Sequence, residues 1–382
     1  MIYLDNQATT RCDPEVVSAM LPWFSEHYGN PHSEGHKAGD LAAEAVENAR
    51  AAVASLIGAT PREIVFTSGA TEANNLAIKG AARHLARQGS ERRRVITVAT
   101  EHKCVLESVR DLAAEGFEPV ILPVSRDGLV SARDLSVALE VPTALVSIMS
   151  VNNETGVIQD IETLSSLTRQ AGALFHTDAA QAAGKMSLTC ASSDLMSLSA
   201  HKFYGPKGIG ALYVRHKPRT RLQPIFSGGG QERGLRSGTL PTPLIVGFGE
   251  AARLAQKALS GEAPRLEGLR AQLLEGLERL FPGLVVNGAQ APRIAGALNL
   301  MFPPGYAARD IMAALPDLAL STGSACSSAE ITPSYVLTAM GLDAKDAARC
   351  LRLSVGRFTS TPEIVQALEE FGVAAREARR AS

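Results

Sequence analysis

The stretch Leu195-Met196-Ser197-Leu198-Ser199-Ala200-His201-Lys202 runs from an apolar segment of strand length straight into polar residues, and the glycine-rich Gly205-Pro206-Lys207-Gly208 follows it. This order places Lys202 just past the end of a buried strand. A Lys that is desolvated in such a position can lose its proton and attack a carbonyl. Considered alone, a Lys at a strand end is more often part of a structural ion pair, so the rest of the chain has to decide between the two interpretations.

Apolar runs of similar length recur upstream and alternate with helical stretches. They are Ile64-Val65-Phe66, Val95-Ile96-Thr97-Val98, Val120-Ile121-Leu122, Ala144-Leu145-Val146-Ser147-Ile148 and Ala173-Leu174-Phe175. Strands too apolar to keep one face in water are typical of a parallel sheet that is covered by helices. The sequence therefore predicts an α/β fold with a mostly parallel sheet.

The length of 382 residues favours one large domain and a smaller one. The segment Ser260-Gly261-Glu262-Ala263-Pro264 is linker-like, and the helix expected after it carries leucines at three- and four-residue steps (Leu266, Leu269, Leu273, Leu277 and Leu280). We place the domain boundary there. Residues 14–260 are expected to form the large domain, and residues 1–13 together with 261–382 the small one.

Two further helices have clear sequence signals. Between Asp40 and Ile57, apolar side chains recur at a four-residue step, which predicts an amphipathic helix with these side chains on one face (Leu41, Ala45, Ala49, Val53 and Ile57). The last helix is expected to begin with Thr361 as its cap, Pro362 in its first turn and Glu363 facing the helix dipole.

The composition excludes several classes of protein. Lys and Arg total 38 against 39 Asp and Glu, so the chain has no basic field with which to grip nucleic acid. No stretch reaches the ~18 continuous apolar residues of a membrane span, and the N-terminus lacks the basic region of a secretory signal. The five cysteines, at positions 12, 104, 190, 326 and 350, form no C-x-x-C pair and are odd in number. Neither a metal site nor a disulfide framework is indicated, and reduced thiols in a cytoplasmic protein fit this pattern.

Polar residues also follow other predicted strands. After Ile64-Val65-Phe66 comes Thr67-Ser68-Gly69-Ala70-Thr71-Glu72, a turn of small residues that opens a helix and could bind a phosphate, although Thr71 acting as a plain helix cap would explain it equally well. Asp178 ends another apolar strand, where a buried carboxylate needs a positive neighbour. His102 lies beyond a third strand and could stack on a ring and move protons.

Together these strand ends supply the three protein parts that pyridoxal 5'-phosphate demands: a phosphate cup, an acid for the ring nitrogen and a Lys for the Schiff base. In an open parallel sheet they would meet, because ligands bind beyond the carboxyl ends of the strands. Neither the Walker nor the G-x-G-x-x-G pattern is present, so these nucleotide-binding motifs are not indicated.

The chain resembles the cysteine desulfurases of the NifS/IscS-like group, which are fold-type I pyridoxal-phosphate enzymes, over about residues 2–372. The matching segments are Leu4-Asp5-Asn6-Gln7-Ala8-Thr9-Thr10, Gly29-Asn30-Pro31, Phe66-Thr67-Ser68-Gly69-Ala70-Thr71-Glu72, Thr100-Glu101-His102-Lys103, Val151-Asn152-Asn153-Glu154-Thr155-Gly156, Ser199 to Gly208, Arg236-Ser237-Gly238-Thr239, Gly323-Ser324-Ala325-Cys326-Ser327-Ser328 and Leu351-Arg352-Leu353-Ser354. The resemblance implies a large domain with a mostly parallel sheet and a smaller α+β domain.

The resemblance also implies residue roles. Lys202 would carry the cofactor and take the α-proton of L-cysteine, with Asp178 at the pyridine nitrogen, Gln181 at the phenolic oxygen and His102 stacked on the ring. Phosphate contacts would come from Ala70, Thr71, Ser199 and His201, with Ala200 beside them and Thr239 supplied by the partner subunit of a homodimer. Asn153 and Arg352 would hold the substrate carboxylate, for which Arg357 is a rival.

Cys326 lies in a small and polar stretch, about residues 321–332, that has no apolar periodicity and is typical of a loop in the small domain. A free Cys is normally buried, so one in a polar loop indicates a reagent. We expect its thiolate to take the sulfur of L-cysteine as a persulfide, leaving L-alanine, and to pass it to an acceptor protein. The other four cysteines are interpreted as bystanders.

Two alternatives stay open at this point. Another fold-type I enzyme, such as an aminotransferase or a selenocysteine lyase, would share Lys202 and Asp178, and a sulfur-carrier scaffold loaded by another protein would need only Cys326. The sequence does not identify the acceptor, which could serve iron-sulfur cluster assembly, nitrogenase assembly or tRNA thiolation. IscS-like members dock an iron-sulfur scaffold protein through a C-terminal extension, and Ser382 follows closely on the last expected helix, so the resemblance does not carry that docking over.

Overall fold

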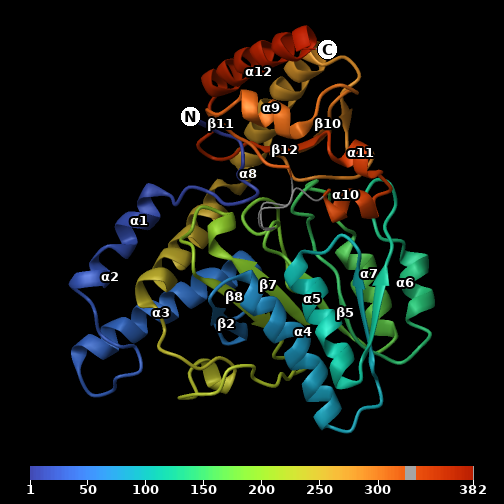
Figure 1. The fold of residues 1–382 in the computed structure, drawn as a ribbon. Coiled ribbons are helices and arrows are strands. Elements are labelled where there is room, and N and C mark those ends of the chain that lie inside the picture. Colours follow the sequence, from blue (N-terminus) through green and yellow to red (C-terminus); the bar gives the residue numbers. More distant parts are fainter. Residues whose placement is uncertain (323–332, 382) are drawn as a thin grey trace.

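The computed structural model describes residues 1–322 and 333–381, so Cys326 lies outside the described residues. Its largest sheet has seven strands in the order β2-β8-β7-β6-β5-β3-β4 (Figure 1). The strands are β2 Ile64–Thr67, β3 Arg94–Val98, β4 Glu118–Leu122, β5 Thr143–Ser147, β6 Leu174–Asp178, β7 Leu195–Ser199 and β8 Gly210–Val214. Only the pairings of β8 with β2 and β7 are antiparallel. The predicted α/β fold with a mostly parallel sheet is confirmed, although β8 was not among the predicted strands.

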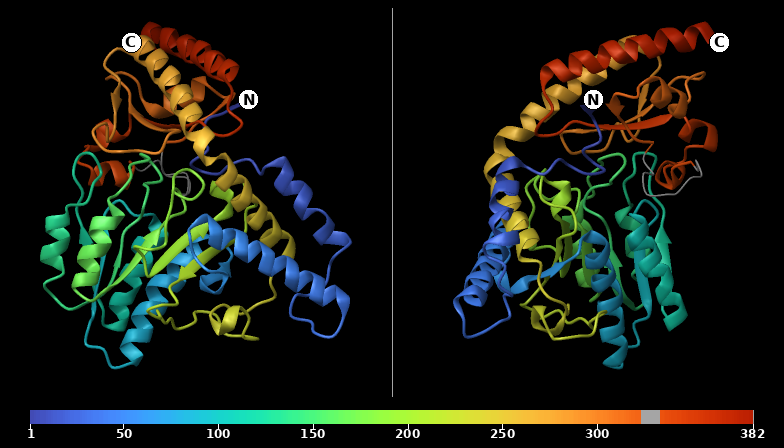
Figure 2. Two further views of the ribbon diagram at one scale, coloured as in Figure 1. Left: turned by 180° about the vertical axis from the view of Figure 1, so that it is seen from behind. Right: turned by 60° about the vertical axis from the view of Figure 1, so that its left-hand side comes forward.

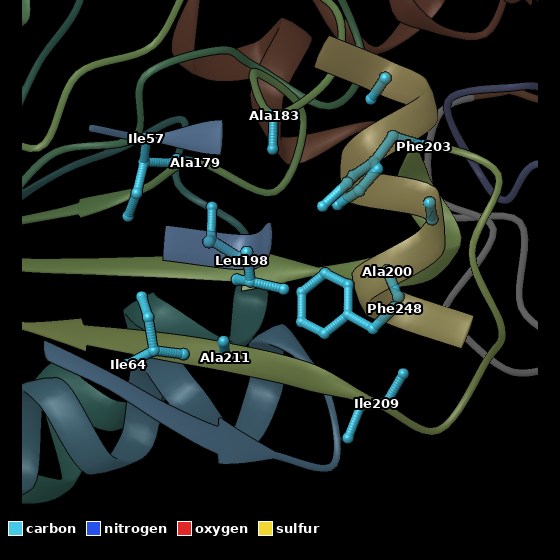
Figure 3. Close-up of a cluster of buried hydrophobic side chains, with 14 of the residues drawn as sticks. Ile57, Ile64, Ala179, Ala183, Leu198, Ala200, Phe203, Ile209, Ala211 and Phe248 are labelled. Carbon is cyan, nitrogen blue, oxygen red and sulfur yellow. The ribbon is translucent and has the colours of Figure 1, made fainter. Parts of the chain in front are cut away.

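Helices cover both faces of this sheet. The helices of the described chain are α1 Pro14–Met20, α2 Pro22–Ser25, α3 Lys37–Leu56, α4 Ala70–Arg87, α5 Lys103–Asp111, α6 Ala132–Ala138, α7 Ile161–Gln170, α8 Thr242–Leu280, α9 Ala308–Ala314, α10 Tyr335–Ala339, α11 Ala344–Ala347 and α12 Thr361–Ala381. Leu195 of β7 belongs to the cluster under α4 and α5, whereas Leu198 belongs to the cluster under α3 and α8. Figure 3 shows Leu198 and Ala211 in this second cluster with Phe248 of α8.

A second, three-stranded antiparallel sheet lies above the first in Figure 1, in the order β12-β10-β9. Its strands are β9 Val285–Val286, β10 Ala297–Met301 and β12 Cys350–Ser354, and a separate parallel pair joins β1 Ile2–Tyr3 to β11 Leu318–Ala319. Phe281, Phe302 and Phe371 build a hydrophobic core of their own here. The first residues of the chain therefore pack with its last third. The division into residues 14–260 and residues 1–13 with 261–382 stays a prediction.

The linker expected at Ser260–Pro264 was wrong, because helix α8 runs without a break through this segment (Figure 2). A Pro inside a helix removes one backbone hydrogen bond and normally kinks or breaks the helix. Here Pro264 lies between two buried stretches of the same helix. Ala251 and Ala255 pack in the core of the large sheet, and Leu269 and Leu273 pack in the small-sheet core. Packing against both cores outweighs the tendency of Pro264 to break the helix, so α8 is one continuous helix that contacts both sheets.

Three local predictions also need correction. The predicted helix over Asp40–Ile57 exists as α3, but Leu41 is 41% exposed and the buried face runs through Ala42, Val46, Ala49 and Val53. A strict four-residue step turns about 40° beyond each full turn, so such a stripe drifts off the core. Helix α12 is capped by Ser360, not Thr361: Glu363 N donates to Ser360 Oγ at 3.4 Å and Ser360 N donates to Glu363 Oε2 at 2.8 Å.

The helix after β2 begins with Gly69 as its cap, so Thr71 lies in the first turn rather than at the cap position. Gly69 has φ +152°, a conformation that side chains rarely adopt, and no side chain caps this helix end. Its first backbone N–H groups therefore stay available to a ligand. Among the described helices, none combines the length and apolarity needed to cross a membrane.

Candidate active site

The carboxyl ends of β2, β3, β5, β6 and β7 meet at one edge of the large sheet, where a cavity of about 420 Å³ lies. Nine residues predicted from the sequence line this cavity: Ala70, Thr71, His102, Asn153, Asp178, Gln181, Ser199, His201 and Lys202. They come from five separate segments of the chain. The topology of the sheet is what brings them together.

One end of the cavity is suited to an anion. The N-terminus of α4 opens into it at Ala70 and Thr71, and the buried Ser199 hydroxyl has no hydrogen-bond partner among the described residues. Burial and the charges of Lys202 and Lys207 lower the pKa of His201 to about 4, so its imidazole is neutral at neutral pH. Lys207, which sequence reasoning did not assign, lines the same cavity and adds a positive charge.

Asp178 lines the same cavity and is held by two neutral donors. Ala180 N donates to its Oδ1 at 2.9 Å, and Asn74 Nδ2 donates to its Oδ2 at 2.7 Å. The positive neighbour expected from the sequence is not found: within the described residues, Asp178 forms no ion pair. Hydrogen bonds from neutral groups satisfy part of the carboxylate and leave its remaining lone pairs for a cation that binds in the cavity.

His102 caps helix α5, and this contact fixes its tautomer. Cys104 N donates to Nδ1 of His102 at 3.3 Å, so Nδ1 carries no proton and Nε2 does. Burial lowers the pKa of His102, and Lys202 and Lys103 lower it further against the attraction of Asp178. The neutral form of the ring is therefore favoured in the folded protein.

Cys104, interpreted from the sequence as a bystander, also lines the cavity. Its Sγ lies 3.0 Å from His102 Nδ1, and Asn74 Nδ2 lies 3.2 Å from the same sulfur. Burial, and then the charge of Asp178, raise the pKa of this thiol to about 12. A thiol that stays protonated at neutral pH is a poor nucleophile, which supports the prediction that Cys104 is not a reagent. Its place at the beginning of α5 is the one expected from the sequence.

Lys202 occupies the short turn Ala200–Lys202 after β7 and reaches back to the N-terminal segment. Its Nζ donates to the carbonyl oxygens of Gln7 at 2.9 Å and Ala8 at 2.8 Å. Lys202 thus lies within the cavity with its amine next to two neutral acceptors. Its role as the reactive amine stays a prediction.

The two candidate carboxylate-binding arginines differ in placement. Arg352 lies on β12, where its Nη1 donates to the carbonyl oxygen of Asn153 at 3.0 Å and its Nη2 pairs with Asp5 at 2.8 Å. Arg357 pairs instead with Asp13 at 3.0 Å and Glu262 at 3.2 Å. Only Arg352 contacts a residue that lines the cavity.

Four predicted site residues do not belong to the described lining of the cavity. Ala200 is fully buried in the core under α8 (Figure 3) and does not line the cavity. Thr239 is exposed and does not line the cavity of its own chain. Cys326 belongs to the segment outside the described residues. Arg352 does not line the cavity itself but donates a hydrogen bond to Asn153, which does.

The residues present fit pyridoxal 5'-phosphate. A helix N-terminus and an unpartnered buried hydroxyl suit a phosphate, and a carboxylate with free lone pairs and a Lys line the same cavity. Of these features, the Ser199 hydroxyl and the second unpartnered atom, Asn153 Oδ1, are buried polar groups that a bound ligand would satisfy. Apolar packing alone would not explain why these two polar atoms are buried without a partner.

Comparison with known proteins agrees with this geometry. The family model described as aminotransferase class-V matches residues 2–368. The chain is 51% identical over 366 residues to "Cysteine desulfurase, mitochondrial" of Arthroderma benhamiae, covering 95% of this chain and 72% of that protein. It is 48% identical to "Cysteine desulfurase IscS" of Rickettsia bellii, covering 96% and 89%.

Among solved structures, one described as SspA in complex with cysteine superimposes with a TM-score of 0.83 at 37% identity, covering 94% of this chain and 100% of that one. The fold, the cavity at the sheet edge and identities near one half over nearly the whole chain agree with one another. The chain belongs to the class-V aminotransferase family and, within it, to the cysteine desulfurases.

Proposed function

We propose that the protein converts L-cysteine to L-alanine with bound pyridoxal 5'-phosphate and passes the sulfur, as a persulfide on Cys326, to an acceptor protein. Membership of the cysteine desulfurases makes the chain an enzyme of this activity. The observation that carries the proposal is the cavity in which Lys202, Asp178 and His102 converge from three strand ends. One related structure is described as containing cysteine, which supports the same substrate here.

Different residues of the chain would bind different groups of the cofactor. The N-terminus of α4, Ser199 and His201 would hold the phosphate, and Asp178 would hold the ring nitrogen in its protonated form. Bound pyridoxal 5'-phosphate supplies an electron sink for the carbanion that forms when the substrate α-carbon loses its proton. Asn74 keeps Asp178 in place through the bond to Oδ2.

The same residues set the proton and sulfur steps. Lys202 Nζ takes the α-proton, and Arg352, with Asn153, orients the substrate carboxylate. His102 carries its proton on Nε2 and can exchange it with the substrate thiol. The Cys326 thiolate attacks the substrate sulfur: an S–S bond forms, the C–S bond breaks, and its electron pair goes to the carbon that becomes the methyl group of alanine.

A persulfide enzyme and the alternatives can be separated with one pair of variants. Cys326→Ala should keep the cofactor's absorbance and its response to L-cysteine but lose release of sulfide with a thiol reductant. Lys202→Ala should lose covalent attachment of the cofactor, measured as loss of the bond trapped by borohydride. Cys12→Ala, which removes a partly buried bystander, serves as the control and should turn over normally.

Each alternative gives a different result. An aminotransferase would not need Cys326, so undiminished turnover of Cys326→Ala contradicts the persulfide step. A sulfur-carrier scaffold would release no alanine from L-cysteine with purified wild-type protein. Release of selenide from selenocysteine with none of sulfide from cysteine would identify a selenocysteine lyase.

The remaining partners are part of the same proposal. We propose a homodimer in which Thr239 of one subunit reaches the phosphate in the other, since Thr239 is exposed and lies outside the cavity of its own chain. A persulfide on an enzyme needs a second thiol to receive it, so the acceptor is a protein thiol such as that of an iron-sulfur scaffold. Reduced thiols favour the cytoplasm as the compartment.

A further inference from the structure

Lys185 contacts Gln181, a residue of the cofactor cavity, although sequence reasoning gave Lys185 no role. It follows Gly184 in the turn after β6, where Gly184 has φ +70°. Its Nζ donates to Gln181 Oε1 at 2.7 Å, and Gln181 Nε2 in turn donates to the carbonyl oxygen of Gln7 at 2.8 Å. Gln7 O also accepts from Lys202, so a chain of hydrogen bonds joins the two lysines.

Lys185 and Gln181 line different cavities although they are hydrogen-bonded to each other. Gln181 lines the cofactor cavity, whereas Lys185 lines a separate cavity of about 30 Å³, with room for about one water molecule, beside Tyr204 and Glu262. Gln7 forms part of the wall of this small cavity. Lys185 therefore does not face a ligand of the main cavity, and it can act there only through Gln181.

The two neighbours of Gln181 agree on one orientation of its amide. Lys185 Nζ donates to the amide oxygen, and the Gln7 carbonyl only accepts, so the amide nitrogen must face Gln7. The nitrogen has two N–H groups, and Gln7 takes one of them. The other N–H belongs to a side chain that lines the cavity, which makes Gln181 a hydrogen-bond donor to a ligand there.

Holding a cation at this place is costly. Burial, and then the positive charges of Lys202 and Arg352, lower the pKa of Lys185 to about 7, against the attraction of Glu262. An apolar side chain would fill the site without that cost. Lys185 lies near the positive charges of Lys202 and Arg352 and bonds to the amide oxygen of Gln181. Its effect on the orientation of this amide gives a reason for its presence.

We propose that Lys185 is a positioning residue that holds the Gln181 amide with its N–H toward the cavity, so that the site selects the ionised form of the cofactor's phenolic oxygen. The inference rests on the proposed function, because the phenolic oxygen is present only if pyridoxal 5'-phosphate binds. Without Lys185, only the bond to Gln7 O holds the amide. Its N–H is then held less firmly toward the cavity, which weakens the preference for the ionised phenolic oxygen and weakens binding.

The test uses the purified full-length protein with its cofactor bound. In Lys185→Met, which keeps the length and removes the donor, the absorption of the bound cofactor should shift toward that of the neutral phenol, and cofactor loss on dialysis should be about tenfold faster, the effect of one lost hydrogen bond. Lys185→Gln, whose amide can still donate, should restore both. Lys345→Met, a change on the exposed surface of α11, is the control and should behave as wild type.

A second comparison separates positioning from a general loss of structure. If Lys185 acts through Gln181, then Gln181→Met should show the same spectral shift, and the double variant should be no worse than Gln181→Met alone. A double variant with additive losses, or a Lys185→Met protein with the wild-type spectrum and retention, overturns the inference. Wild-type protein that binds no pyridoxal 5'-phosphate overturns the proposed function instead.

Discussion

Arg352 and Arg357 stand five residues apart, yet they have different surroundings. Arg352 bonds to the backbone of a cavity residue, whereas Arg357 is held between Asp13 and Glu262 and lies 4.2 Å from the centre of the Tyr204 ring. The sequence offered both as binders of the substrate carboxylate. Their partners now favour Arg352 for the substrate and Arg357 for stability.

Replacement of each by Lys should separate the two roles, because Lys keeps the charge and loses the planar fork. Arg352→Lys should raise KM for L-cysteine by roughly tenfold or more, equivalent to about 1–3 kcal/mol of lost hydrogen bonding. Arg357→Lys should leave KM unchanged and lower the free energy of unfolding by about 1–2 kcal/mol. Steady-state kinetics and denaturant unfolding of both variants check this. A raised KM in Arg357→Lys with normal kinetics in Arg352→Lys would reverse the assignment.

At the same scale, the sequence predicted residues that follow strands and missed residues placed by helices. Lys202, Asp178 and His102 could be found because each follows an apolar run within a few residues. Asn74 could not, since it lies on the second turn of α4 and reaches Asp178 only through the packing of that helix on the sheet. Cys104 had an available signal: it follows a capping His by two residues, which places its N–H on the imidazole.

Among the elements, β6 carries a feature that affects stability rather than chemistry. His176 in its middle is fully buried, with Ser147 Oγ 2.8 Å from its Nδ1 and Ser197 Oγ 3.0 Å from its Nε2. Burial lowers the pKa of His176 to about 3 from 6.5. A depressed folded-state pKa gives stability that is present above the unfolded pKa of 6.5 and is lost as the pH falls toward 3.

Between about pH 8 and about pH 5, this one residue should therefore cost the fold on the order of 2 kcal/mol. His176→Gln can still bond to both serines and does not titrate, so it should lose less stability than wild type over this interval by about that amount. Urea unfolding of both proteins at the two pH values, at equal protein concentration, measures the difference. Equal losses would mean that His176 is not the buried neutral imidazole of β6.

The elements themselves were predictable where one signal dominated. Six of the seven strands of the large sheet were found because runs such as Val95–Val98 are apolar enough to be buried on both faces. Strand β8, Gly210–Val214, was not predicted, because it begins with Gly and follows a glycine-rich turn. Helix α8 was divided at Pro264 because local propensity favours a break, whereas the two cores on which it packs were visible only in the structure.

For the whole molecule, helix α8 and the N-terminal segment tie the two sheets together. Asn6 and Gln7 bond to Ser354 of β12, while Lys202 of the large-sheet side bonds to Gln7. The amine of the site is thereby linked to the small sheet, which also carries Arg352. Relative movement of the two sheets would alter the distance between the base and the carboxylate-binding residue.

The proposed dimer extends this connection to a second chain and gives a test by subunit mixing. Thr239→Asp should bind the cofactor poorly, because a carboxylate would face the phosphate of the partner subunit's site, and Lys202→Ala should be inactive by itself. In a mixed dimer, the Thr239→Asp chain keeps its Lys202 and receives an intact Thr239 from the Lys202→Ala chain. One site in each mixed dimer is then complete.

Random exchange makes half of the dimers mixed, so desulfurase activity should recover to about a quarter of the wild-type value. Mixing each variant with itself is the control and should give none. If Thr239 served the site of its own chain, both sites of a mixed dimer would lack one group and activity would stay at the level of the parents. Full activity of Thr239→Asp alone would show that this residue meets no phosphate in either chain.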